Sequence, residues 1–216
     1  MLSFWLPLQC VVCGNPPRQL CEDCLSRLPL RTRIVRRLGA PSGLACADYS
    51  GSVATLVKAY KNDGSVILAR YLGSQLAQVL ADWAKQIPTD RPIEIALVPA
   101  PSRAISNRTR GYSPARLLAA NTAAQLRALG VNATVCDVLR VFGPVRDQGD
   151  LNGLQRRTNL VGRMQAVPAA NSVLGNRRIV LLDDIVTTGA TLAEMNRCLS
   201  SRGLFAQSFA AFAETL

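Results

Sequence analysis

Residues 179–191 read IVLLDDIVTTGAT. The four apolar residues at the start are typical of a strand that is buried on both faces of a parallel sheet. Two carboxylates, Asp183 and Asp184, follow directly, and a helical pattern begins at about Leu192. Between them lies a turn of small and hydroxyl residues that includes Thr187, Thr188, Gly189, Ala190 and Thr191. This order predicts a ligand site at the carboxyl end of a parallel strand.

The residue types in this stretch indicate what such a site would bind. Exposed backbone N–H groups at the start of a helix can hold a phosphate, and the helix end contributes about 0.3–2 kcal/mol. Carboxylates accept O–H donors well, so Asp183 and Asp184 suit the hydroxyls of a sugar. The sequence therefore predicts a site for a phosphate and a ribose. The alternative is that the two aspartates only cap the helix, although a cap needs one aspartate and no turn of this composition.

The bulk composition indicates a globular protein. A chain of 216 residues suits one domain, or one domain with a small appendage. Its 49% hydrophobic and 18% charged residues are typical of a chain with a packed core. No apolar run reaches the roughly 18–20 residues of a membrane span, and residues 1–8 lack the basic start of a secretory signal. We therefore expect a cytoplasmic protein.

The charge balance is strongly basic. The net charge is +11, from 25 Lys and Arg against 14 Asp and Glu, and most of the basic residues are Arg. This charge is compatible with a polyphosphate ligand or with nucleic acid, and heavy use of Arg by the source organism would also produce it. The chain contains no His, which excludes Ser-His-Asp and Cys-His catalysis.

The N-terminal part carries two CxxC pairs, formed by Cys10, Cys13, Cys21 and Cys24. Four thiolates in two close pairs suit tetrahedral Zn²⁺, whereas disulfides or redox dithiols fit an apparently cytosolic chain less well. Residues 31–37 form a basic run that is interpreted as a solvated linker, with a nucleic-acid contact as the second interpretation. We expect residues 1–43 to form a zinc-binding segment with this linker, and residues 44–216 to form the main domain.

The rest of the chain alternates strand and helix patterns, which favours an α/β fold with a mainly parallel sheet. Helices are expected over 53–60, 66–85, 113–129 and 191–202. Strands are expected over 45–50, 93–98, 178–182 and 205–212, and within 133–141. A loop at 102–112 carries Arg103, Arg108 and Arg110. Cys46, Cys136 and Cys198 are expected to be small core residues.

The acidic pair and the turn after it resemble the binding motif of type I phosphoribosyltransferases. Further motifs narrow the resemblance to the ComF family, the phosphoribosyltransferase-like proteins associated with bacterial DNA uptake. Besides the CxxC pairs, these motifs are Tyr49 with Gly51, Lys61 ahead of Gly64, residues 98–102 (VPAPS), residues 110–112 (RGY), and Gln148, Leu151, Arg156 and Asn159. The chain departs from the family pattern at Ser113 and Pro114, which suit the start of a helix.

The resemblance implies a type I phosphoribosyltransferase-like fold that binds phosphoribosyl pyrophosphate with Mg²⁺. It assigns Asp183 and Asp184 to the ribose hydroxyls and the backbone of residues 187–191 to the 5-phosphate. Pro101, Ser102 and Arg103 would approach the pyrophosphate. Arg108 and Arg110 would act in catalysis as a mobile lid that excludes water.

Two functions of different classes remain open at this point. The first is phosphoribosyl transfer to an unidentified acceptor, which needs positioning and electrostatics more than a nucleophile. The second is a non-catalytic protein of this fold that binds single-stranded DNA or proteins of DNA uptake. A metal-binding scaffold is a third possibility, and it leaves the acidic pair without a purpose. Oligomerisation is compatible with each of them.

Overall fold

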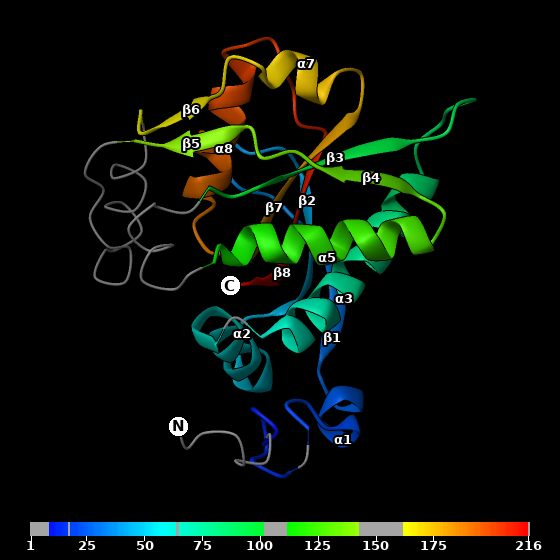
Figure 1. Cartoon of the computed structure of the whole chain (residues 1–216), viewed down its shortest axis with the longest axis vertical. Coiled ribbons are helices and arrows are strands. Elements are labelled where there is room, and N and C mark those ends of the chain that lie inside the picture. Colours follow the sequence, from blue (N-terminus) through cyan, green and yellow to red (C-terminus); the bar gives the residue numbers. More distant parts are fainter. Residues whose placement is uncertain (1–8, 17, 64, 102–111, 143–161, 216) are drawn as a thin grey trace, which may run out of the picture.

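The computed structural model describes residues 9–16, 18–63, 65–101, 112–142 and 162–215 (Figure 1). Within these residues one sheet contains six strands: β1 (Leu30–Val35), β2 (Gly43–Asp48), β3 (Glu94–Pro99), β4 (Asn132–Val135), β7 (Arg178–Val186) and β8 (Ser208–Glu214). Their order in space is β1-β2-β8-β7-β3-β4. Every neighbouring pair is parallel except β1 and β2.

Three helices lie on one side of this sheet: α2 (Gly51–Asp63), α3 (Val66–Lys85) and α5 (Pro114–Ala128). In α3, buried leucines recur every four residues from Leu68 to Leu80, which gives the helix an apolar stripe. The Ser65 hydroxyl caps its start by accepting a hydrogen bond from the Leu68 N–H at 3.2 Å. Because a side chain at Gly73 would lie 2.8 Å from the Asn121 Cβ, this glycine allows α3 to pack closely on α5.

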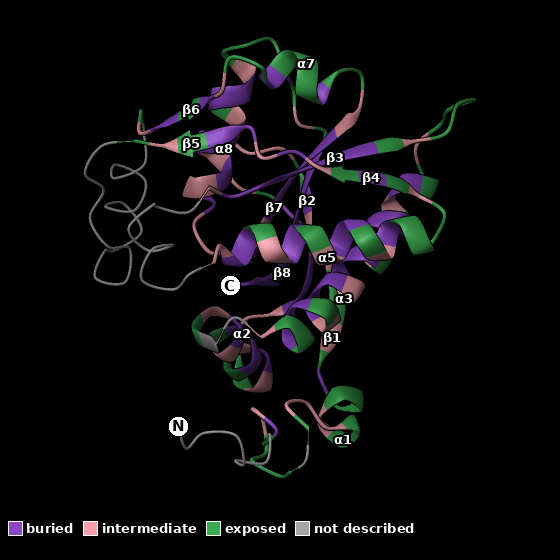
Figure 2. Ribbon diagram, viewed as in Figure 1, coloured by how far each residue is buried: buried purple, intermediate pink, exposed green. Residues whose placement is uncertain are grey.

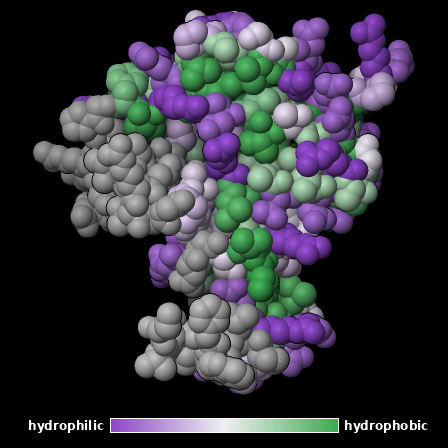
Figure 3. All heavy atoms as spheres, in the orientation of Figure 1, coloured by the Kyte–Doolittle hydropathy of each residue, from purple (hydrophilic) through white to green (hydrophobic). Residues whose placement is uncertain are grey.

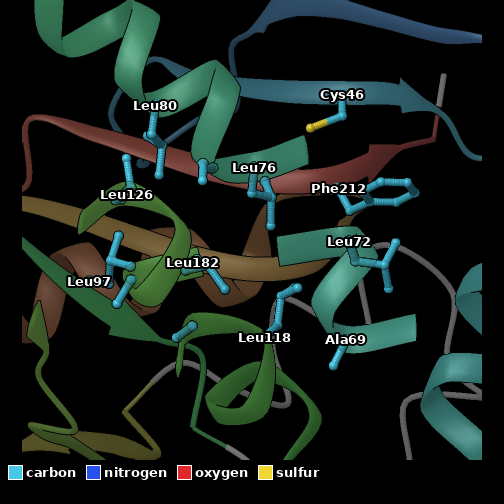
Figure 4. Packing of buried hydrophobic residues seen from close by; sticks show 14 of the residues in the cluster. Cys46, Ala69, Leu72, Leu76, Leu80, Leu97, Leu118, Leu126, Leu182 and Phe212 are labelled. Carbon is cyan, nitrogen blue, oxygen red and sulfur yellow. The ribbon is translucent and has the colours of Figure 1, made fainter. Parts of the chain in front are cut away.

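The core on this side joins the helices to the middle of the sheet (Figure 4). Its labelled side chains include Leu72, Leu76 and Leu80 of α3, Leu118 and Leu126 of α5, and Leu97, Leu182 and Phe212 of the strands. Each fully buried side chain of this size contributes roughly 1.5–3 kcal/mol. The same burial continues along the central strands, which are the most buried part of Figure 2.

The opposite face of the sheet is covered by α8 (Ala190–Ser200), through Leu192, Met195 and Leu199. A two-stranded antiparallel sheet of β5 (Leu139–Val141) and β6 (Met164–Ala166) and the short helix α7 (Ala170–Leu174) lie beside α8. The N-terminal segment, with α1 (Glu22–Ser26), lies at the other end of Figure 1, where Val11, Leu20 and Leu28 pack against the core. Hydrophilic side chains are spread over the rim of the larger part on the face drawn in Figure 3.

The predicted fold class is confirmed: the chain has a mainly parallel sheet flanked by helices and a small N-terminal segment with a cysteine cluster. The helix expected over 66–85 has these bounds in the structure. Cys46, Cys136 and Cys198 are buried core residues, as predicted. No helix among the described residues is long and apolar enough to cross a membrane.

The strand expected within 133–141 is present as β4, and the same stretch also holds β5, which belongs to a different sheet. Two expectations were wrong in detail. Residues 31–35 belong to β1, which pairs with β2, so most of the basic run is an edge strand and not a linker. Strand β7 does not end at Leu182 but continues to Val186. The proposed division of the chain at residue 43 stays a prediction, and β1 lies on the N-terminal side of it.

Candidate functional site

The candidate site lies where β7 extends beyond its pairing with one of its two neighbouring strands. Pairing of β7 with β3 ends at Leu182, opposite Pro99, whereas pairing with β8 continues to Val186, opposite Glu214. Asp183 and Asp184 therefore stand in a part of β7 that pairs with β8 on one side and, among the described residues, has no strand partner on the other. This explains why the strand extends through the acidic pair although its apolar run has ended.

Asp183 lies at an open hollow in the surface. The hollow is lined by Asp183 and residues 185–192, so it brings one predicted carboxylate together with the whole predicted turn. Burial, followed by the neighbouring charge of Asp184, raises the pKa of Asp183 to about 7. The Asp184 N–H donates to Asp183 Oδ1 at 2.9 Å, which fixes the orientation of the half-buried carboxylate.

Asp184 is only 6% exposed and faces a lysine. Lys61 Nζ, from the last turn of α2, lies 3.0 Å from Asp184 Oδ1. Burial alone would lower the pKa of Lys61, but the charges of Asp184 and Asp183 outweigh it and raise that pKa. Among the residues that the structure describes, Lys61 is therefore the cation that compensates the acidic pair.

Two tyrosines fix the end of α2 in the place that this ion pair requires. The buried Tyr60 hydroxyl donates to the Pro114 carbonyl at 2.5 Å, and the Tyr112 hydroxyl donates to the Lys61 carbonyl at 2.7 Å. Burial and then the nearby Asp184 charge raise the pKa of Tyr60, so its hydroxyl keeps the proton that it donates. These bonds join the end of α2 to the start of α5.

The turn between β7 and α8 lines the hollow and leads into the start of α8. Gly189 adopts φ +75° and occupies the N-cap position of α8, and the first helical hydrogen bond runs from the Ala193 N–H to the Gly189 carbonyl at 2.8 Å. The N–H groups of the first helical turn have no acceptor within the helix. The Ala190 N–H contacts the Thr188 hydroxyl at 3.4 Å. An anion in this hollow would meet both these donors and the positive end of the helix.

The second predicted ligand turn is described only at its start. The Ala100 N–H donates to the Leu182 carbonyl at 2.8 Å, which places the half-buried Pro101 near Leu182, just before the acidic pair in β7. The expectations for Ser102, Arg103, Arg108 and Arg110 fall on residues outside those that the structure describes. Their roles at the pyrophosphate and in the lid stay predictions.

The four N-terminal cysteines form a cluster in which all sulfur atoms lie within 4.8 Å of one another. Tetrahedral ligation with a Zn–S distance of about 2.3 Å places sulfurs about 3.8 Å apart, and Cys13 Sγ lies 3.7 Å from Cys21 Sγ. The Cys21 and Cys24 N–H groups contact the Cys10 and Cys21 sulfurs, each at 3.5 Å. The donor set and spacing are thus compatible with one zinc ion.

The thiols of this cluster differ in acidity. Burial would raise the pKa of Cys10, but backbone donors, first the Cys21 N–H, outweigh it and lower that pKa to about 6. Desolvation and the neighbouring thiols raise the pKa of Cys24 to about 12. Four thiolates so close together repel one another, and a bound cation would relieve that repulsion.

Sequence reasoning placed the acidic pair, the turn and the cysteine cluster, but it did not assign Lys61 to the site. It had noted Lys61 only as part of a family motif. A usable signal was present, because a buried carboxylate pair requires a cation and the chain has only three lysines, Lys58, Lys61 and Lys85. Lys61 alone of these falls in a motif.

Comparison with known proteins gives one clear relative. No family model matches the chain. It is 25% identical over 198 residues to Competence protein F of Haemophilus influenzae, a match that covers 90% of this chain and 80% of that protein. The resemblance to the ComF family indicated by the motifs is confirmed by this match and by the cysteine cluster.

Among solved structures the chain is similar to hypoxanthine phosphoribosyltransferases. The enzyme from Trypanosoma cruzi matches with a TM-score of 0.38 and 16% identity, over 66% of this chain and 64% of that one. The hypoxanthine-guanine enzyme from Leishmania donovani gives a TM-score of 0.36 and 17% identity, over 68% and 67%. The chain thus spans about two thirds of these structures.

Proposed function

We propose that this chain, a ComF-like relative of Competence protein F, binds phosphoribosyl pyrophosphate with Mg²⁺ and handles its phosphoribosyl group. One observation carries the proposal: a half-buried carboxylate and a turn of backbone donors at a helix start line the same hollow. The first group suits sugar hydroxyls, and the second suits a phosphate. A ligand that has both groups a few ångströms apart is a ribose 5-phosphate, which is part of this compound.

The sugar half of the ligand would be held by the acidic pair. Asp183 borders the hollow, so it is the carboxylate placed to accept a ribose hydroxyl. Asp184, which pairs with Lys61, would support Asp183 and limit the local negative charge to about one unit. This partial neutralisation matters because the incoming ligand is itself a polyanion.

Magnesium fits the donor chemistry of this half, since it prefers oxygen ligands and keeps several waters. Asp183 is the carboxylate that would hold it through such waters, because the Asp184 oxygen is engaged by Lys61. When bound, the ion would supply charge neutralisation at the pyrophosphate. The phosphate half would rest on the N–H groups of residues 187–191 and the start of α8.

If the protein transfers the phosphoribosyl group, its own residues would act by orientation and exclusion of water. The chain has no His, and the site as described offers carboxylates, a lysine and backbone donors. Such groups orient the sugar and stabilise charge, which suits displacement of pyrophosphate by an acceptor. Arg108 and Arg110 remain candidates for the lid on the basis of the family resemblance.

The name of the relative points to competence, so we place the chain in a ComF-type role linked to DNA uptake, as a cytoplasmic protein. A second candidate function, binding of single-stranded nucleic acid without catalysis, is favoured by the net charge of +11 and by the exposed Arg31 on the edge strand β1. A salt titration tests it, because the log–log slope for single strands is about −0.7 per phosphate contact. Absence of DNA binding at low salt would exclude it.

We further propose that the cysteine cluster holds one structural Zn²⁺ per chain. Of the described residues between 9 and 28, only Cys10 and Leu28 are buried, and a structural zinc can contribute roughly 10–16 kcal/mol to folding. The segment around the cluster would therefore depend on the metal, whereas β1, although it falls within residues 1–43, would belong with residues 44–216 to the phosphoribosyltransferase-like domain.

The direct test is calorimetry with phosphoribosyl pyrophosphate and Mg²⁺. The variant pair Asp183→Asn and Asp184→Asn should lose at least tenfold in affinity, because charged acceptors contribute about 1.5–3 kcal/mol each. Asp82→Asn is the matched control, since Asp82 pairs with Lys85 on the exposed side of α3. No binding by the wild type would refute the proposal. If binding is found, pyrophosphate release should be measured with a panel of bases as acceptors.

A further inference from the structure

Arg37, two residues beyond the end of β1, reaches the turn that would hold the 5-phosphate. Its Nε–H donates to the Thr187 carbonyl at 2.8 Å. One terminal nitrogen donates to Glu214 Oε1 at 2.7 Å and to the Thr215 carbonyl at 3.1 Å. This side chain therefore connects β1, the turn after β7 and the end of β8, three segments that are far apart in the chain.

The donors of Arg37 are directed at the protein itself. A guanidinium has five N–H donors, and its second terminal nitrogen contacts the Arg36 carbonyl at 3.1 Å. All three nitrogens thus have protein acceptors, and the charge is matched by the buried Glu214. Arg37 does not line the hollow. This pattern is that of a residue that orients backbone, not of one that contacts a ligand.

The bond to Thr187 has a direct geometric effect on the turn. In a trans peptide the C=O and N–H groups point in opposite directions. With the Thr187 carbonyl held by Arg37, the Thr188 N–H of the same peptide must point away from Arg37. Thr187 and Thr188 line the hollow whereas Arg37 does not, so this orientation directs a donor toward the side where an anion would lie.

The aliphatic part of Arg37 packs against the next turn residue. A Cβ placed on Gly189 would lie 2.4 Å from the Arg37 Cβ and 2.7 Å from its Cγ. The arginine therefore touches the turn twice, through a hydrogen bond at Thr187 and through van der Waals contact at Gly189. From these contacts we infer that Arg37 is a positioning residue for the phosphate-binding turn. The inference rests on the proposed function.

Binding measurements test this role with ligands that differ in one group. Arg37→Met keeps the stem against Gly189 and removes the donors. It should weaken binding of both phosphoribosyl pyrophosphate and ribose 5-phosphate by about tenfold or more, as expected for lost charge-assisted bonds. Binding of inorganic pyrophosphate, which lacks the 5-phosphate, should stay within about twofold of wild type. Arg36→Met is the control, because Arg36 is exposed and contacts Arg37 through its carbonyl only.

A second readout needs no ligand. The NMR order parameter of the Gly189 amide should be about 0.85 in the wild type and in Arg36→Met, and below about 0.6 in Arg37→Met. If Arg37→Met does not fold, Arg37→Lys replaces it, because lysine keeps the charge opposite Glu214 and lacks the Nε–H donor. Unchanged order and unchanged affinity would overturn the inference and leave the proposed function standing. A wild type that binds no ligand would overturn the proposed function, and the order parameter would still decide whether Arg37 holds the turn.

Discussion

Replacing Gly189 with alanine should destabilise the protein through two effects that can be separated. The residue adopts φ +75°, a backbone conformation that costs an L-residue about 1–2 kcal/mol. The new methyl group would also lie 2.4 Å from the Arg37 Cβ. Overpacking of this kind typically costs a further 1–3 kcal/mol. We therefore expect a total loss of about 2–5 kcal/mol for Gly189→Ala.

Gly203 provides the matched control. Its φ of +73° is nearly the same, and a Cβ there would meet no atom within 4 Å. Gly203→Ala should therefore show only the backbone cost, and the difference between the two variants isolates the contact with Arg37. In the double variant Arg37→Gly/Gly189→Ala the new methyl group meets neither the Arg37 Cβ nor its Cγ, so the combined loss should be smaller than the sum of the two single losses.

Urea unfolding at neutral pH measures these free energies, and a thermal scan should show about 2–4 °C per kcal/mol for a chain of this size. Equal losses for Gly189→Ala and Gly203→Ala would refute the packing of Arg37 on the turn. Additive losses in the double variant would lead to the same conclusion. Either result would also contradict the contact between Arg37 and Gly189, which is one of the two contacts on which the positioning role of Arg37 depends.

Three further predictions concern charge and metal. Because the pKa of Asp183 is raised to about 7, the folded protein favours the protonated carboxyl, and this contribution to stability is lost as the pH rises. The free energy of unfolding, measured at several pH values, should therefore fall between about pH 4 and 7 by on the order of 2–4 kcal/mol relative to Asp183→Asn. Parallel pH curves for the two proteins would contradict the raised pKa. Lys61→Met leaves Asp184 buried without its cation and should cost about 3–5 kcal/mol in the same assay, whereas Lys85→Met, at an exposed pair, should cost less than about 1 kcal/mol. Metal analysis should find one zinc per chain. The variant Cys13→Ser, or a chelator, should release the zinc and cause loss of structure around the cluster. A stable, metal-free protein with an unchanged circular dichroism spectrum would exclude a structural zinc.

The spacing of apolar residues in the sequence predicted well those helices and strands that bury one continuous face or run of side chains. The stripe of leucines in α3 and the apolar run before Asp183 are such parts. The pairs of cysteines predicted their own cluster, because a four-ligand site specifies its spacing. The turn at residues 187–191 was found for a similar reason, since its composition follows from a local backbone requirement.

The contacts that complete the site depend on the order of the strands, and sequence pattern does not report that order. Residues 31–37 were interpreted as a linker because their four arginines hide the alternation of apolar and polar residues that is typical of an edge strand. Such a strand needs apolar residues on one face only. The sequence around Arg37 therefore did not predict its hydrogen bond to the Thr187 carbonyl. Lys61 was similarly separated from Asp184 by most of the chain, and only the packing of α2 on the sheet brings them together.

The position of β8 has a consequence for how the protein is made. This strand is the last of the sheet in chain order, yet it lies between β2 and β7 in the interior of the sheet. Gly43 of β2 pairs with Phe209 of β8. Strand β2 therefore cannot complete its hydrogen bonding until β8 has been synthesised. During synthesis β1 and β2 can form only a hairpin that lacks its inner neighbour, and the sheet closes after residue 214 has been added. Until then both β2 and β7 expose unpaired edges, which makes the nascent chain a natural client for chaperones.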